Sequence, residues 1–275
     1  DKIVDQIGFR KIEVDGTDIK LNGKPIFLRG ISMHEESPIR CGRAYSIEDA
    51  EKLLSSAIEL GCNFVRLAHY PHNETIIRLA DKMGILVWSE IPVYWTILWD
   101  NADTYKLASQ QLLKMINRDK NRASVIIWSV ANETPRGESR LKFLTGLITE
   151  ARKLDATRLI SAATELTFKD FTITVDDPLS EKLDVIGANE YLGWYSYSID
   201  EIKNFSWKTK FNKPLIISEF GADAKFGLHG DEQTRWTEEY QNSIYREQIN
   251  MLNKVEFLRG MSPWILYDFH SPRRP

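Results

Sequence analysis

The sequence predicts an α/β fold in the form of a (β/α)8 TIM barrel, and three observations support that prediction. Short runs rich in β-branched residues recur along the 275-residue chain, and longer stretches with helical periodicity separate most of them. This alternation indicates parallel strands joined by crossover helices. Eight strands in about 250 residues fit a closed barrel better than an open sheet. The sequence also lacks a glycine-rich dinucleotide or phosphate loop, the usual reason to expect the open sheet.

Each expected strand is a short apolar run that ends close to a turn or a polar residue. The eight runs lie at residues 26–30, 63–68, 85–90, 125–131, 159–163, 185–189, 215–219 and 262–268. Amphipathic segments expected as outer helices lie at residues 47–60, 74–82, 105–121, 141–154, 199–211 and 233–252. The fifth connection, residues 164–182, has the composition of a loop rather than of a helix.

The two ends of the chain differ from this pattern. Residues 12–14 and 19–21 flank the turn sequence DGTD, which predicts a β-hairpin. We expect residues 1–24 to form this hairpin, as a lid or as the stub of an upstream β-sandwich domain, and residues 25–275 to form the barrel. After the eighth strand the sequence reads DFHSPRRP and stops, so the last outer helix is expected to be missing. Either the chain is a fragment, or another segment covers that face.

Composition narrows the classes of function. The formal charge is -3, from 36 basic and 39 acidic residues without a block of like charges, which favours neither a nucleic-acid nor an anionic-membrane partner. No apolar run approaches the ~18 residues of a membrane span. Cys41 and Cys62 are too few for a disulfide framework and lack the spacing of a zinc site, so both are expected to be buried thiols. The sequon at Asn132 would place a glycan beside the candidate site described next, which favours a bacterial cytoplasm or periplasm over a eukaryotic secretory compartment.

Polar residues follow the apolar strands at the end where barrels carry their chemistry. They are Arg66 and His69 (second strand), Glu90 (third), Asn132 and Glu133 (fourth), Asn189 and Tyr191 (sixth), and Glu219 (seventh). Two carboxylates that meet at one rim are the equipment for glycoside hydrolysis. The alternative is that each glutamate only caps or salt-bridges a neighbouring helix.

Several segments carry a family resemblance in a fixed order. They are LRGISMHE, VRLAHYPHNE, WSVANE, NEYLGWY, SEFGAD, WTEEYQ and PWILYDFHSPRR. Together they resemble the catalytic barrel of glycoside hydrolase family 2, the β-galactosidase and β-glucuronidase family. The resemblance covers residues 8–275, and GFRKIEV is similar to the segment that enters the barrel from an upstream sandwich domain.

The resemblance implies a retaining exo-β-glycosidase with Glu133 as acid/base and Glu219 as nucleophile. Retention needs the two carboxyl groups about 5–5.5 Å apart. Asn132 is similar to the family's amide that bonds the sugar 2-hydroxyl, and Tyr191 to its tyrosine that hydrogen-bonds the nucleophile. As alternatives, Asn132 could be a strand-end cap and Tyr191 a packing aromatic.

The remaining candidates lie around this pair. His34 and His69 match sugar-subsite positions of the family, and Trp264 matches the floor of its glycone pocket, although core packing is an equal alternative for the indole. Arg66 is expected to lower the pKa of Glu219 and hold it ionised. Glu90 could bind a sugar hydroxyl or pair with Arg66. Asn189 is a supporting residue.

Two aromatic loops are left with two interpretations each. One carries Tyr94, Trp95 and Trp99 after the third strand, and the other carries Trp194, Tyr195 and Tyr197 after the sixth. Each could line the aglycone side of the site or pack against a missing domain.

Departures from the family refine the expected substrate and cofactors. Some members hold Mg²⁺ through a Glu and a His after the third strand, whereas SEIPVYW supplies Glu90 without a His, so we expect no metal and no other cofactor. Glucuronidases carry an Asn-x-Lys element that this chain ends too early to contain, and Glu190 stands where they usually have Arg. These features favour a neutral β-hexoside, as in a β-galactosidase.

Other readings stay open. Within the family they are a β-glucuronidase or a β-mannosidase. Beyond it are an endo-glucanase or mannanase of the same barrel clan, and a non-catalytic sugar-binding barrel fragment. The expected partner is a carbohydrate, with additional β-sandwich domains in a longer chain and a homo-oligomer left open.

Overall fold

A closed parallel barrel of eight strands forms the centre of the molecule in the computed structural model, which describes residues 4–271. The order around the barrel is β11-β13-β14-β4-β5-β6-β7-β8. The barrel strands are β4 (Leu28–Met33), β5 (Phe64–Leu67), β6 (Leu86–Glu90), β7 (Val125–Asn132), β8 (Leu159–Thr164), β11 (Ile186–Asn189), β13 (Leu215–Glu219) and β14 (Leu258–Met261). The predicted fold class is therefore confirmed.

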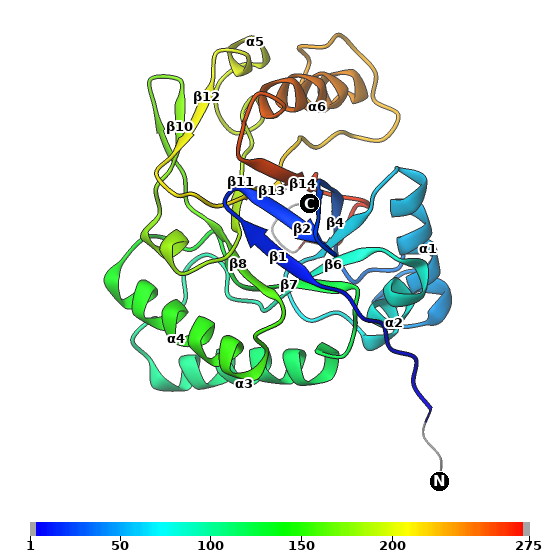
Figure 1. Ribbon diagram of the computed structural model, residues 1–275. Helices are drawn as coiled ribbons and strands as arrows, with labels where there is room; N and C mark the ends of the chain where they lie inside the picture. The colour runs from blue at the N-terminus through cyan, green and yellow to red at the C-terminus, as the bar shows by residue number, and fades with distance from the viewer. Residues whose placement is uncertain (1–3, 272–275) are drawn as a thin grey trace.

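Five longer helices and one short helix surround this barrel (Figure 1). They are α1 (Ile47–Glu59), α2 (Glu74–Met83), α3 (Ala102–Asp119), α4 (Glu138–Leu154), α5 (Ile199–Ile202) and α6 (Glu238–Leu252). Local sequence explains several boundaries. Ser46 and Asp49 form a capping box at the start of α1, and Gly84, with φ of 73°, ends α2 in the left-handed conformation that glycine adopts at low cost.

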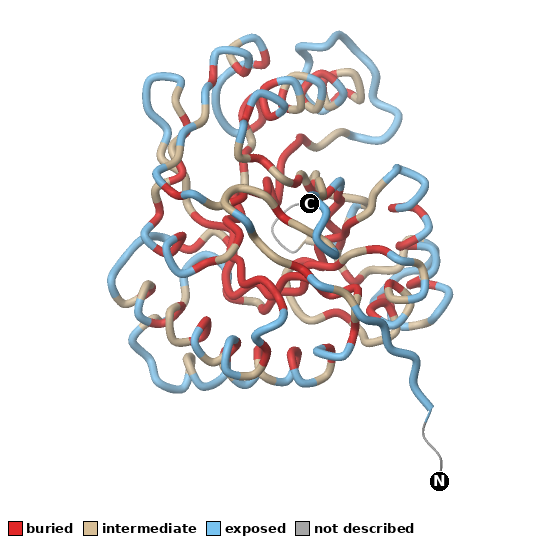
Figure 2. Tube along the Cα trace, in the orientation of Figure 1, coloured by how far each residue is buried: buried red, intermediate tan, exposed pale blue. Residues whose placement is uncertain are grey.

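The buried surface follows the pattern that the apolar runs predict. Every residue of β5, β7, β8 and β13 is buried, since these strands face the barrel interior on one side and the helices on the other. Figure 2 shows this buried trace at the centre of the molecule, with exposed segments outside it.

The N-terminal hairpin is present and is part of a three-stranded sheet. Its strands are β1 (Ile12–Asp15), β2 (Asp18–Leu21) and β3 (Lys24–Ile26), so the sheet extends past the boundary expected at residue 24. Ile12 and Ile19 pack in one apolar cluster with Leu28, Phe64 and Leu159, which open three of the barrel strands. The sheet thus covers the N-terminal end of the barrel, as Figure 1 shows for β1 and β2.

The eighth strand was placed too late by the sequence pattern. β14 occupies residues Leu258–Met261, and the run expected as the strand, residues 262–268, crosses the rim instead. Gly260 allows the close approach to β4 that closure needs, because a Cβ atom there would lie 2.9 Å from the Leu28 Cβ. Pro263, which lacks an N–H, cannot continue the ladder. Within the described residues no helix follows β14.

Two connections also differ from expectation. Only residues Ile199–Ile202 of the segment 199–211 are helical, and β12 (Ser206–Thr209) follows. The segment 164–182, expected as a loop, contains β9 (Thr167–Lys169), β10 (Thr172–Val175) and the 3-10 helix η1 (Pro178–Glu181). β12 pairs in parallel with β10, so the two segments stabilise each other in a small sheet outside the barrel. Such pairing between distant segments leaves no local periodicity to detect.

Candidate active site

Arg66 lies at the centre of the candidate site, at the C-terminal end of β5, with its side chain fully buried. Its Nη1 donates to Glu219 Oε1 at 2.7 Å, and its Nε and Nη2 donate to the two oxygens of Glu90, each at 3.0 Å. Nη2 also donates to Asn132 Oδ1 at 2.9 Å. One guanidinium therefore joins residues from the ends of β6, β7 and β13, as the strand-end pattern predicts.

Glu219 is held by donors on both carboxylate oxygens. Arg66 binds Oε1, and the Tyr191 hydroxyl donates to Oε2 at 2.8 Å. Burial raises the pKa of Glu219 above its usual value, while Arg66 and His69 oppose that rise. Arg66 lowers the pKa of Glu219 as expected, but burial has the larger effect, so the pKa stays above its usual value.

Glu90 has more hydrogen-bond partners than Glu219. Besides Arg66, it accepts from Trp88 Nε1 at 2.8 Å, and His69 Nδ1 lies 2.7 Å from its Oε1. Burial alone would raise the pKa of Glu90, but Arg66 and His69 lower it to about 2. Of the two roles that the sequence left open, the structure shows the ion pair with Arg66. Contact of Glu90 with a sugar hydroxyl stays a prediction.

Glu133, the first residue after β7, is half-buried and also has both oxygens occupied. Asn189 Nδ2 donates to Oε1 at 2.9 Å, and Trp95 Nε1 donates to Oε2 at 2.9 Å. Asn189 also donates to Asn132 Oδ1 at 3.1 Å, which links the end of β11 to the end of β7. Glu133 and Glu219 thus lie at the same end of the barrel, joined through Asn132 and Arg66.

A buried ion pair stabilises the chain just beyond Glu133. Arg140 of α4 binds both oxygens of Asp177, at 2.8 and 2.9 Å, and its Nε donates to the hydroxyl of buried Thr134 at 2.9 Å. Asp177 also caps η1. Sequence reasoning missed this pair, because nothing near Arg140 or Asp177 distinguishes them from surface charges.

His34, His69 and Trp264 come together on one side of the site. The His69 ring stacks on Trp264 with centroids 5.0 Å apart, and the His34 ring meets the edge of Trp264 at 5.3 Å. Burial lowers the pKa of His34 to about 4, so this imidazole is neutral at neutral pH and can donate or accept a hydrogen bond. The three residues are grouped as predicted; their contact with a sugar stays a prediction.

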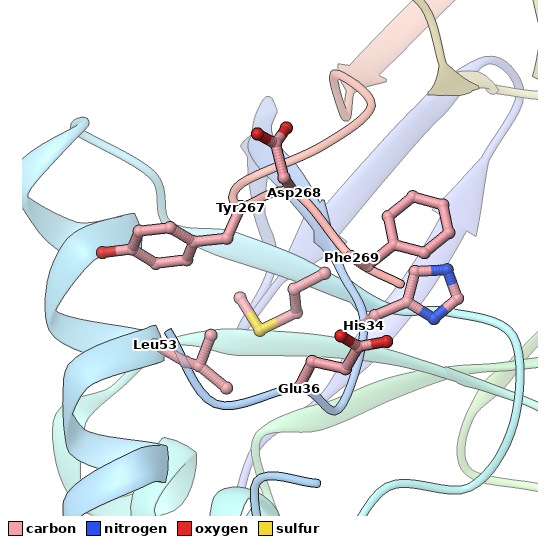
Figure 3. A pocket seen from close by; sticks show the side chains of 7 residues that line it. His34, Glu36, Leu53, Tyr267, Asp268 and Phe269 are labelled. Atoms are coloured by element: carbon pink, nitrogen blue, oxygen red, sulfur yellow. The ribbon is translucent and has the colours of Figure 1, made fainter. Parts of the chain in front are cut away.

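A small pocket flanks the site on the side of His34 (Figure 3). Phe269, 4.1 Å from His34 between ring centroids, lies beside it in the figure. The residues that line the pocket are Met33, His34, Glu36, Leu53, Tyr267, Asp268 and Phe269. Of the residues that line the pocket, only His34 also belongs to the candidate site. The pocket therefore lies beside the rim and does not contain the two glutamates.

The two aromatic loops divide between rim and core. Tyr94 and Trp95 are exposed at the rim, whereas Trp99 packs edge-on against Phe143 in the main apolar cluster. In the second loop Trp194 is buried, while Tyr195 and Tyr197 are exposed. Exposure alone therefore separates aromatics available to a ligand from those that fill the core.

Residues 4–271 contain no cluster of three or more His, Cys, Asp or Glu side chains arranged to hold a metal ion. None of the helices in this part of the chain is long and apolar enough to cross a membrane. Of the two thiols, Cys41 is exposed and Cys62 half-buried, so the expectation of two buried thiols is wrong for Cys41 and only partly met by Cys62.

Comparison with known proteins identifies the family. Residues 12–272 match the model of glycosyl hydrolases family 2, TIM barrel domain. The chain belongs to this family. β-Glucuronidase of Rattus norvegicus is 32% identical over 98% of the chain, which spans 42% of that protein. The family resemblance inferred from the seven segments is thereby confirmed.

Solved structures of family 2 agree. A β-D-glucuronidase from Dictyoglomus thermophilum superposes with a TM-score of 0.85 and 31% identity, covering 98% of this chain and 49% of that one. A β-galacturonidase from Eisenbergiella tayi, solved with galacturonate, gives a TM-score of 0.82 and 27% identity, covering 95% of this chain and 47% of that one. The chain thus spans about half the length of these relatives, which contain further segments.

Proposed function

We propose that this barrel hydrolyses β-linked uronides, β-glucuronides first, with retention of configuration. The observation that carries the proposal is the pair Glu133 and Glu219, each hydrogen-bonded on both oxygens at the same end of a family 2 barrel. The neutral β-galactoside expected from the sequence has less support, because the relatives are named for uronides.

The residues suit a double displacement. Glu219 attacks the anomeric carbon while Glu133 protonates the departing glycosidic oxygen, and Glu133 then takes a proton from the water that releases the sugar from Glu219. Arg66 and Tyr191 orient the attacking carboxylate. Asn132 uses its Oδ1 to accept from Arg66 and Asn189, so its amide Nδ2 is the group available to a sugar hydroxyl.

Glu190 does not argue against an acidic sugar in this fold. Its side chain is 1% exposed, and the Leu192 N–H donates to its Oε1. Burial raises the pKa of Glu190 to about 8, so the carboxyl is mainly protonated at neutral pH. A neutral group enclosed behind the site does not repel a uronate carboxylate.

A substrate panel tests the proposal. Aryl β-D-glucuronide, β-D-galacturonide, β-D-galactoside and β-D-mannoside should be compared at equal concentration, on this chain and on a longer chain that contains it. We expect a uronide to give the highest kcat/KM, by about 10² or more, since a site built to bond one substituent leaves polar groups unpaired with another. A preference for the galactoside would return the assignment to a neutral sugar, and binding without turnover would favour a non-catalytic barrel.

Stereochemistry tests the mechanism separately from the sugar. Proton NMR of the first product should show the β-anomer, as retention requires. Glu133→Ala should keep turnover of a dinitrophenyl glycoside, whose leaving group needs little protonation, and azide should accelerate it by yielding a β-glycosyl azide. An α-anomer as first product would contradict the double displacement.

A further inference from the structure

Trp95 is tied to the end of β7 through its backbone as well as its side chain. The Asn132 N–H donates to Val93 O at 2.9 Å, and the Trp95 N–H donates to Asn132 O at 3.1 Å. These bonds form a parallel bridge between Tyr94 and Asn132, the residue directly before Glu133. These backbone bonds therefore hold the loop in the position from which the indole donates to Glu133 Oε2 at 2.9 Å.

Both residues joined by that bond have an uncommon backbone conformation. Trp95 has φ of 55° and Glu133 has φ of 50°. Non-glycine residues rarely adopt positive φ, and they keep it only where the surrounding structure imposes it, often at functional sites. Here the two left-handed residues point their side chains at each other, and the contact they form involves a carboxylate of the proposed chemistry.

The indole of Trp95 has two features that can act at the site, its N–H and the face of its ring. Its N–H can only donate, so it holds Glu133 Oε2 in place, as the amide N–H of Asn189 holds Oε1. Trp95 as a whole residue is 41% exposed at the rim.

Further aromatic rings connect Trp95 to the proposed sugar pocket. Tyr94 meets Trp95 edge to face, with ring centroids 5.3 Å apart, and lies 5.6 Å from the His69 ring, which stacks on Trp264. A continuous aromatic wall thus runs from Trp264 past Tyr94 to Trp95. A sugar bound against Trp264 would project its leaving group along this wall toward the indole.

We propose that Trp95 is a positioning residue for the acid/base and the platform for the aglycone: its N–H holds Glu133 in the orientation that protonates the leaving group, and its exposed ring stacks on that group. The inference rests on the proposed function. It assigns preference to aromatic or other flat apolar aglycones, because an indole face contributes most when it contacts such a surface.

Two variants separate the functions of the side chain. Trp95→Phe keeps a ring and removes the N–H, whereas Trp95→Ala removes both. Trp99→Phe is the matched control, since Trp99 lies in the same loop but packs against Phe143. Each protein is assayed with phenyl and 2,4-dinitrophenyl β-D-glucuronide, or with the matching aryl glycosides of whichever sugar the panel identifies.

Trp95→Phe should lower kcat/KM for the phenyl glycoside about tenfold, the usual effect of losing one hydrogen bond to a charged group. The dinitrophenyl glycoside, which needs no acid, should change less than twofold. Trp95→Ala should in addition raise KM for both substrates, and Trp99→Phe should leave all these quantities unchanged.

The inference and the proposed function fail in different ways. If wild type is active and Glu133→Ala behaves as proposed, but Trp95→Phe loses no activity or loses it equally with both substrates, Trp95 is only structural. If wild type turns over none of the glycosides, the proposed function fails first, and the Trp95 assignment falls with it.

Discussion

The surroundings of the two glutamates differ in a way that matches their proposed roles. Glu219 is 5% exposed, and its partners are a fully buried guanidinium and the hydroxyl of Tyr191. Glu133 is half-buried, and one of its donors is the rim residue Trp95. A nucleophile must stay in place and stay ionised, whereas an acid/base must exchange protons with incoming water in every turnover. Arg66 and Tyr191 hold Glu219 in place and favour its ionised form against the effect of burial, whereas a loop at the rim supplies a donor to Glu133.

The largest effect should come from the buried side of this comparison. Glu219→Gln replaces a carboxylate by an amide of the same shape and removes the group that forms the bond to the sugar. We expect kcat to fall by about 10⁴-fold or more, as for other removed nucleophiles. Steady-state assays with an activated aryl glycoside provide the measurement. A loss of less than tenfold would assign the nucleophile to another residue.

Removing the shared cation should affect stability as much as catalysis. Arg66→Met leaves Glu90 and Glu219 buried without their charge partner, which should lower the free energy of unfolding by about 3–5 kcal/mol. Urea titration followed by tryptophan fluorescence measures it. Arg246→Met is the matched control, because Arg246 pairs with Glu232 at the exposed surface and its loss should leave the midpoint unchanged. Equal effects of the two substitutions would show that burial does not distinguish the pairs.

A smaller effect is expected from the second donor to Glu219. Tyr191→Phe removes the hydroxyl that donates to Oε2 and favours the carboxylate. The pKa of Glu219 should rise further, so the acid limb of the kcat/KM profile should move to higher pH, with a loss of about tenfold near neutral pH. Tyr105→Phe is the control, since the Tyr105 hydroxyl binds Glu150 between outer helices. An unmoved acid limb in Tyr191→Phe would separate this tyrosine from the nucleophile.

The sequence predicted the barrel well where strands are buried on both faces. An apolar run such as residues 125–131 is stable only when it is buried on both faces. Polar residues at the ends of such runs, including Glu133 and Arg66, could therefore be identified from their position in the sequence pattern. The prediction failed where a segment depends on a distant partner. The run 262–268 is as apolar as a strand, but β14 precedes it, because closure needs Gly260 beside Leu28.

The same limit applies to the site. The sequence supplied the residues that react, but not the contacts that orient them. Trp95 and Glu133 lie 38 positions apart, and Arg140 and Asp177 lie 37 apart. No spacing or periodicity connects such pairs. The net pKa direction of Glu219 was also beyond the sequence, since it depends on how far burial outweighs the effects of Arg66 and His69.

The smallest effect is expected from metal removal. This experiment tests whether Arg66 or a metal ion is the cation that binds the buried carboxylates. Two carboxylate oxygens offer about four acceptor sites. In Glu90 all four have partners: Arg66 Nε and Trp88 Nε1 at Oε2, and Arg66 Nη2 and His69 Nδ1 at Oε1.

A hard cation such as Mg²⁺ binds through free carboxylate oxygens, so at Glu90 it would have to displace Arg66, which already neutralises this side of the site. Dialysis against EDTA should therefore leave kcat and KM within about twofold of their starting values. Glu90→Gln, by contrast, should disturb the Arg66 cluster and lower activity whether or not metal is present. A reproducible loss of activity with EDTA that Mg²⁺ reverses would contradict this prediction. If the Glu90→Gln variant no longer responds to EDTA, a metal ion competes with Arg66 for Glu90 in the working site.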